Sequence, residues 1–306
     1  MPVPNLTFET EGFFDCHSCG QCCRTQWTIR VEDSKADRLR RDGPEVPLVQ
    51  DSGGSWLTAQ VDGACGFLST TNLCSIHQTN GPEMKPTTCL LFPFVLTPIP
   101  NGLQVGLSHY CPSVRQKLGR PIEQHREWLE DILTRSEPGL RTPRNSVVKV
   151  SGKHTVGWTG YEFLESEIVS RLSKDQPSAV FLALTEALVN NLDHWQRLDP
   201  QELFAEASRA RLEHGRVIAQ QLAQQLGPRL SSTPDLFDTK PYLISLVQRK
   251  FLTKGQDLLS QLATLAVISI LLEREPDSEA CIESLELLVT HQASFELELG
   301  ELLARG

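Results

Sequence analysis

Cysteine is the residue type in this chain whose number and spacing point most directly to chemistry. Eight of the nine cysteines fall within the first 111 residues, and only Cys281 lies farther on. Soft thiolates bind zinc or iron tightly, and a metal centre needs several ligands from a small volume. The sequence therefore predicts a metal-binding region at the start of the chain. Its predicted ligands are Cys16, Cys19, Cys22, Cys23, Cys65, Cys74, Cys89 and Cys111.

The spacing of the first four cysteines fits more than one kind of centre. Two cysteines separated by two residues can chelate one tetrahedral ion, because the intervening turn directs both sulfurs inward. Cys16, Cys19 and Cys22 also suit an iron–sulfur cluster such as 4Fe-4S, in which three thiolates each bind one iron. Cys23 adjoins Cys22 and must point elsewhere. Eight thiolates fit two four-thiolate sites, one cluster plus a structural zinc, or one cluster with spare thiols.

Composition favours reduced thiols. The first residues have neither a basic nor an apolar signal region, and no stretch has the length and apolarity of a membrane span. We therefore expect a cytoplasmic protein without membrane contact, whose cysteines bind metal, and a disulfide framework is the weaker alternative. The net charge of −9 argues against an electrostatic nucleic-acid binder.

Charged and imidazole groups near the cysteines allow two interpretations. Six basic residues lie between Arg24 and Arg41, and a solvated helix face is the simpler explanation. The alternative is a docking surface for an acidic cofactor tail, with Arg24 and Arg30 binding a carboxylate. Nearby histidines are expected to support or flank the site rather than to ligate, since so many thiols compete. They are His17, His77 and His109.

The pattern of residues predicts an α+β fold in two parts. A small, irregular, cysteine-rich metal-binding domain with short strands covers 1–120, and a mostly α-helical bundle covers 121–306, with a linker at about 136–158. A hairpin of 89–96 and 103–109 is expected to return Cys111 beside Cys89. Cys281 is expected to be a small buried hydrophobe. The other predicted elements are strands at 26–31, 55–58 and 147–150, and helices at 33–41, 121–133, 159–172, 177–197, 200–226, 239–252, 256–273 and 278–303. Asp199 is expected to cap the helix that begins at Pro200, and Thr159 and Glu162 to form a capping box. Thr71 and Asn72 are expected to form the tip of the excursion between Cys65 and Cys74.

The cysteine spacing resembles a known family. The motifs are Cys16-x-x-Cys19-Gly-x-Cys22-Cys23, Cys65-x-Phe-Leu, Leu73-Cys74-Ser-Ile-His77 and Thr88-Cys89-x-x-Phe-Pro93. Over residues 13–120 they resemble the CxxCxxCC zinc- or iron-chelating family, and within it the chain is most similar to flagellin lysine-N-methylase-like proteins. That resemblance implies a metal-bound cysteine domain, iron–sulfur in character, and methyl transfer from S-adenosylmethionine to protein lysine.

Two departures bear on the methylase hypothesis. Phe92 and Phe94 stand where the family pattern has tyrosine and arginine, and no glycine-rich nucleotide loop is visible. S-adenosylmethionine would then have to bind at the metal centre or in an unfamiliar pocket. The sequence leaves three hypotheses open: a metallocluster-dependent protein methylase whose helical part recruits a protein substrate, a metal carrier or binding module, and an interaction protein with structural zinc.

Overall fold

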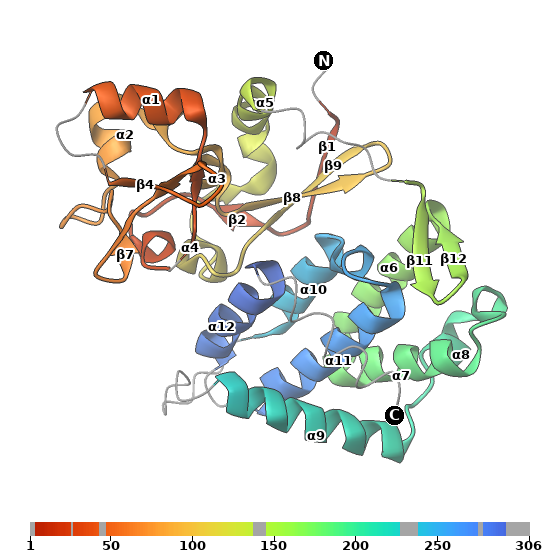
Figure 1. Ribbon diagram of the computed structural model, residues 1–306. Helices are drawn as coiled ribbons and strands as arrows, with labels where there is room; N and C mark the ends of the chain where they lie inside the picture. The colour runs from red at the N-terminus through yellow and green to blue at the C-terminus, as the bar shows by residue number, and fades with distance from the viewer. Residues whose placement is uncertain are drawn as a thin grey trace. The chain divides into compact units, whose positions relative to one another are not determined.

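The computed structural model divides the chain into two compact units (Figure 1). The cysteine unit comprises residues 1–4, 11–95 and 111–142, and the helical unit comprises 5–10, 96–110 and 143–306. The structure describes residues 4–25, 27–42, 47–136, 145–226, 238–274 and 278–291. Short strands and small sheets dominate the first unit and helices the second, which confirms the predicted α+β class.

These units differ from the two contiguous segments into which the sequence was divided at residue 120. Strand β1 (Leu6–Phe8) pairs in parallel with β9 (Gly102–Leu107), and this pairing places both strands in the helical unit. Helix α5 (Arg126–Arg135) stays in the cysteine unit, where it contacts α3 (Thr87–Leu91). Backbone pairing between segments so far apart in sequence leaves no local signal.

The cysteine unit is built from short elements that supply few apolar contacts each. Its apolar cluster contains Val31, Ala36, Leu39, Phe67, Ile76 and Met84, and Cys65 and Cys74 pack against it. The strands form the sheets β3-β5-β4, β6-β7 and β10-β2. The remaining elements are β2 (Phe13–Phe14), η1 (Gln21–Cys23), β3 (Arg30–Val31), α1 (Asp33–Asp42), β4 (Leu48–Gln50), β5 (Trp56–Thr58), β6 (Gln60–Val61), β7 (Ala64–Cys65), α2 (Ser75–Asn80), η2 (Pro82–Met84), α4 (Pro112–Arg115), β10 (Arg120–Pro121) and η3 (Ile122–His125).

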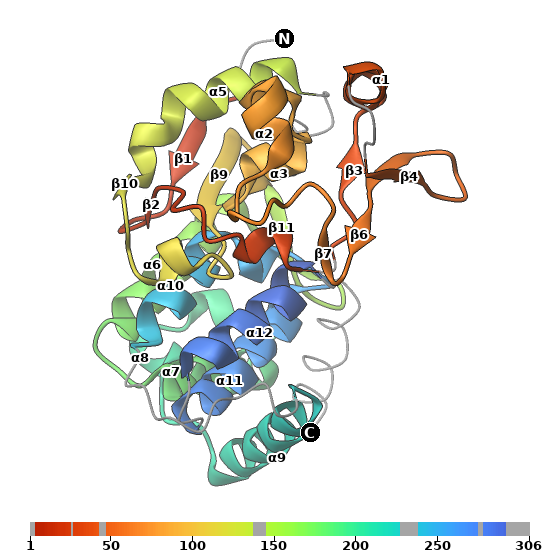
Figure 2. The same ribbon diagram turned by 90° about the vertical axis from the view of Figure 1, so that its left-hand side faces the viewer.

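Helix α11 (Leu258–Arg274) is the centre of the helical unit. Nearly every side chain from Leu258 to Leu272 is buried, on all sides of the helix. It contacts α7 (Pro177–Asn190), α9 (Arg209–Leu226) and α12 (Ser278–His291), as Figures 1 and 2 show. The remaining elements are β8 (Phe94–Ile99), β11 (Val147–Ser151), β12 (His154–Gly157), α6 (Trp158–Leu172), η5 (Trp195–Arg197), α8 (Pro200–Leu203), α10 (Lys240–Gln248) and η7 (Phe251–Thr253).

Several predicted helix ends are confirmed and others change. Asp199 caps α8, accepting hydrogen bonds from the backbone N–H groups of Gln201 and Glu202. The capping box predicted at Thr159 is wrong, because α6 already begins at Trp158 with Gly157 as its N-cap and no side-chain cap. Within the expected linker, 147–157 forms the β11–β12 hairpin, and 137–144 lie outside the described residues.

Other predicted elements are shorter than expected. Only Arg30 and Val31 of the strand predicted at 26–31 are extended in a sheet, and Gln26 lies outside the described residues. The strand expected from residue 89 begins at Phe94, because 87–91 forms α3. The predicted helix at 278–303 is described as far as His291. In the described part of the chain, no helix combines the length and apolar character that crossing a membrane requires.

Candidate metal centre

All eight predicted ligands lie in the cysteine unit. Cys16 and Cys19 are exposed on the loop between β2 and η1, and the other six are partly or fully buried. None of the chain's nine cysteines, all of which are described, forms a disulfide. The six are Cys22 and Cys23 in η1, Cys65 at the end of β7, Cys74 as N-cap of α2, Cys89 within α3 and Cys111 as N-cap of α4.

A tight return of the chain brings Cys65 and Cys74 together. The Leu68 N–H donates to the Cys65 carbonyl at 2.8 Å, and Leu68 pairs with Cys74 in an isolated antiparallel bridge. Asn72, with φ of 62°, forms the predicted tip of this excursion. The Phe67 N–H also donates to the Cys65 sulfur, an arrangement that stabilises a thiolate.

Helix α1 holds the segment that carries Cys89. The Thr87 N–H donates to Glu32 Oε1 at 2.9 Å, and Lys35 Nζ donates to the Lys85 carbonyl at 2.7 Å. Burial raises the pKa of Cys89 to about 12, against the lowering effect of Lys85, and the thiols of Cys65, Cys23 and Cys74 raise it further.

Cys22 and Cys23 project from the single turn η1. Gly20, with φ of 73°, starts this turn, and its carbonyl accepts from the Cys23 N–H at 3.1 Å. The two thiols are hydrogen-bonded to each other, which raises the pKa of Cys22 and lowers that of Cys23 to about 7. Lys85 favours both thiolates by its charge. Lys85 lies between Pro82 and Pro86, and nothing in the sequence predicted that it would act on the thiols.

Cys111 sits at the start of α4. Burial raises the pKa of its thiol, while the backbone N–H groups of Val114 and Ser113 donate to the sulfur and favour the thiolate. Its thiol has charge interactions with those of Cys19 and Cys22, and the position beside Cys89 that the sequence predicted stays a prediction.

The thiols lie in one part of the cysteine unit, but they do not surround a common position that an ion could occupy. Among the described residues, no three His, Cys, Asp or Glu side chains lie close enough to hold one metal ion. A bound ion would therefore draw the sulfurs together, as expected where metal binding and folding are coupled. The donor set itself fits zinc or iron, since it offers thiols, backbone N–H groups that donate to them, and the cation of Lys85.

Three of the six basic residues that follow the cysteines, Arg24, Lys35 and Arg40, have partners within the protein. Arg24 donates to the Cys19 carbonyl at 3.1 Å and to Asn72 Oδ1, so it joins the first cysteine loop to the tip of the 65–74 excursion. Arg40 lies over the Trp56 ring at 4.5 Å. Arg30 is exposed on β3. The predicted joint role of Arg24 and Arg30 in holding a cofactor stays a prediction.

The histidines occupy separate places. His17 Nδ1 is hydrogen-bonded to the Asp15 carbonyl at 2.8 Å and to Ser113 Oγ at 3.1 Å, which ties the first cysteine loop to α4. His77 lies in the last turn of α2. His109 belongs to the helical unit and packs against Tyr242. Cys281 is fully buried in α12, as predicted.

Comparison with known proteins concerns this same segment. Residues 15–117 match the family model CxxCxxCC, described as "Putative zinc- or iron-chelating domain". The chain is 29% identical over 105 residues to the uncharacterized protein MJ0939 of Methanocaldococcus jannaschii, an alignment spanning 34% of this chain and 37% of that protein. No solved structure matches. The segment that carries the eight cysteines is thus similar to the CxxCxxCC family of zinc- or iron-chelating domains.

Proposed function

We propose that residues 15–117 hold zinc or an iron–sulfur cluster through their eight cysteines, and that the helical unit serves as the surface for a protein partner. The observation that carries the metal assignment is the gathering of eight cysteines, none of them in a disulfide, inside the segment that matches a metal-chelating family.

The residues around the thiols stabilise the thiolate form that a metal centre requires. Metal ligation needs thiolates, and several adjacent negative charges repel one another unless they are compensated. Lys85 and the backbone N–H groups of Phe67, Ser113 and Val114 supply that compensation. When bound, the metal would stabilise the fold of the cysteine unit and give a centre able to accept or exchange ligands.

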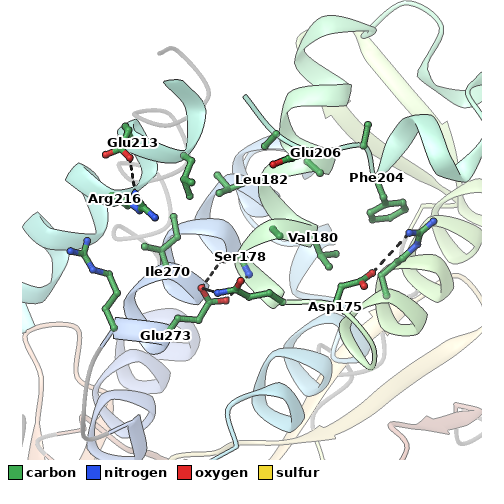
Figure 3. Close-up of a pocket in the computed structure, with 18 of the residues that line it drawn as sticks. Asp175, Ser178, Val180, Leu182, Phe204, Glu206, Glu213, Arg216, Ile270 and Glu273 are labelled. Carbon is green, nitrogen blue, oxygen red and sulfur yellow. Dashed lines mark hydrogen bonds and ion pairs between the residues drawn. The ribbon is translucent and has the colours of Figure 1, made fainter. Parts of the chain in front are cut away.

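The helical unit offers a groove for the partner. A hollow of about 940 Å³ lies among α7, α9 and α11 (Figure 3). Its wall carries both charges, with Arg171, Arg216 and Arg274 facing the same hollow as Asp175, Glu206, Glu213 and Glu273, around an apolar floor that includes Val180, Leu182 and Ile270. A peptide segment with apolar side chains flanked by charges of both signs suits such a wall.

Methyl transfer from S-adenosylmethionine is the narrower hypothesis. It would require the cofactor carboxylate to be held beside the metal, and the predicted groups for this were Arg24 and Arg30. Because Arg24 is already bound to Asn72 and the Cys19 carbonyl, we favour the non-enzymatic role of a metal-binding or carrier module.

Anaerobic purification followed by metal and sulfide analysis tests the proposal. Iron with acid-labile sulfide would indicate a cluster, and zinc without sulfide a thiolate zinc site. Protein that contains neither metal, and takes up neither when offered, would overturn it. Calorimetric titration of the loaded protein with S-adenosylmethionine then tests the narrower hypothesis, and binding that vanishes in Cys19→Ser would restore methyl transfer as the better assignment.

A further inference from the structure

Two segments of the helical unit lead directly to predicted metal ligands. Strands β1 and β9 pair in parallel, so the chain leaves both of them at the same end of their sheet. It passes from β1 into the cysteine unit after Thr10, and from β9 into the same unit after Tyr110. Cys16 lies six positions beyond Thr10, and Cys111 directly follows Tyr110.

The ends of both strands are fastened to the last turn of α10 and the residue after it. Glu9 accepts hydrogen bonds from Ser245 Oγ at 2.6 Å and from the Leu107 N–H at 2.9 Å. The Leu107 carbonyl accepts from Arg249 Nη1 at 3.0 Å. The backbone of β9 approaches so closely here that a Cβ added to Gly106 would lie 2.2 Å from Arg249 Cγ. These contacts hold β1 and β9 together just before the chain leaves the helical unit.

Contacts with α10 continue as far as the residues at which both segments leave the helical unit. The Thr10 N–H donates to Gln248 Oε1 at 3.0 Å, and Gln248 Nε2 donates to Thr10 Oγ1 at 2.7 Å. On the other segment, His109 packs against Tyr242 of α10, with 5.2 Å between the ring centroids. Both segments are therefore anchored a few residues before the cysteine that each carries.

The same two segments meet again inside the cysteine unit. His17 Nδ1 lies one residue beyond Cys16 and is hydrogen-bonded at 3.1 Å to Ser113 Oγ, two residues beyond Cys111. Cys16 and Cys111 are thus carried by segments that are fastened before the ligands, in the helical unit, and joined after them, in the cysteine unit.

We propose that the α10 clasp, which comprises the hydrogen bonds of Ser245, Gln248 and Arg249 to residues 9, 10 and 107, positions Cys16 and Cys111 for the metal. Ligands on restrained segments lose less conformational freedom on binding, so the clasp raises the metal affinity. Because such coupling is reciprocal, bound metal stabilises the clasp, and the helical unit responds to metal occupancy. This inference rests on the proposed metal-binding function and deepens it, since it names residues outside 15–117 that act on the centre.

Gln248 is the residue at which the clasp can be weakened without disturbing a core. Its hydrogen bonds to Thr10 are exposed, and replacing it leaves the buried ion pair of Arg249 in place. In competition with a zinc-binding dye, full-length Gln248→Ala should bind Zn²⁺ about two- to tenfold more weakly than wild type, the factor that corresponds to the net free energy of a hydrogen bond. Gln248→Glu should restore most of the affinity, because a carboxylate oxygen can still accept from the Thr10 N–H.

Gln176→Ala is the matched control for Gln248→Ala. Gln176 Nε2 donates to Glu273 Oε2 at 2.9 Å in the same helical unit, on a segment that carries no predicted ligand. Its Zn²⁺ affinity should equal that of wild type. Equal affinities in Gln176→Ala and Gln248→Ala would overturn the coupling.

Hydrogen exchange of wild type gives the reciprocal measurement and needs no variant. The Glu9 N–H donates to the Val105 carbonyl and the Leu103 N–H to the Asn5 carbonyl, so these amides report on the pairing of β1 with β9. They should exchange more slowly in the Zn²⁺-loaded chain than in the stripped chain, by about the factor found for the affinity, while the amides of α11 do not change. Equal exchange of the Glu9 and Leu103 amides with and without Zn²⁺ would also overturn the coupling. Wild type that binds neither Zn²⁺ nor iron would instead overturn the proposed function.

Discussion

Arg249 and Glu286 form a two-point ion pair inside the helical unit. Arg249 Nη1 donates to Glu286 Oε1 at 2.6 Å and Nη2 donates to Oε2 at 3.0 Å. The side chains are 2% and 0% exposed. Arg249 Nη1 also donates to the Leu107 carbonyl at 3.0 Å, so the pair links the end of α10, α12 and β9. Neither charge has access to water, and each depends on the other.

Replacing one partner should therefore destabilise the protein strongly. Arg249→Met leaves a buried carboxylate without its cation, and we expect a loss of about 3–5 kcal/mol in the free energy of unfolding. Changing both residues, in Arg249→Met with Glu286→Leu, should recover most of that loss, since an apolar pair of similar volume is often neutral. Urea unfolding followed by circular dichroism measures both. An equal loss in the single and double variants would contradict this account.

Stability should also depend on Glu9. Its carboxylate accepts hydrogen bonds from the Leu107 N–H at 2.9 Å and from Ser245 Oγ at 2.6 Å. Burial raises its pKa from 4.5 to about 7, although Arg249 acts in the opposite direction. Between these values the folded chain holds a proton that the unfolded chain releases. The contribution of Glu9 is therefore greatest below pH 4.5 and is lost as pH rises through about 7.

Glu9→Gln isolates this effect because glutamine has the shape of the protonated acid. The free energy of unfolding of wild type should fall relative to that of Glu9→Gln by about 3 kcal/mol as pH rises over this interval. Parallel pH profiles for the two proteins would show that Glu9 has an ordinary pKa.

Removal of metal should affect the two units differently. The cysteine unit has a small apolar cluster, whereas the helical unit has a large core centred on α11. Ligation should supply much of the stability of the former. After chelator treatment, limited proteolysis should cleave within 11–95 and spare 145–226 and 238–274. Equal rates of cleavage in both would mean that the metal does not stabilise the cysteine unit selectively.

Arg24 should support the metal centre without touching the metal. It connects the Cys19 carbonyl to Asn72, and loss of such an outer partner typically costs ten- to a hundredfold in metal affinity. We expect Arg24→Met to weaken zinc binding by about that factor. Arg30→Met is the matched control, since Arg30 is exposed on β3. Competition with a zinc-binding dye measures both, and equal affinities in the two variants would remove Arg24 from this role.

The sequence correctly predicted those features that depend on residues close together in the chain. Asp199 followed by Pro200 predicts a capped helix start, and the structure has one. Cys281 is buried as its apolar neighbours indicated. The start of α6 was missed because the hairpin β11–β12 runs directly into it and supplies its first residues. Tertiary context decided that boundary, not the Thr159 cap.

The cysteine spacing predicted which residues are candidate ligands, but it did not predict which thiols interact with one another. Cys111 was expected beside Cys89 because a hairpin separates them in sequence. Its interactions with Cys19 and Cys22 depend on how α4 packs beside β2, which no periodicity encodes. Lys85 likewise becomes significant only when α1 and α3 bring it near three thiols.

The buried position of α11 also constrains how the chain is made. Its residues, 258–274, are translated late, yet α7 and α9 bury their apolar faces against it. Those faces must stay exposed on the ribosome until α11 emerges, so the helical unit cannot complete its core before then. All eight cysteines of the metal-binding segment emerge more than a hundred residues earlier. The metal that we propose can therefore load onto the nascent chain before the core of the helical unit is complete, and a chain truncated ahead of residue 258 should still acquire it.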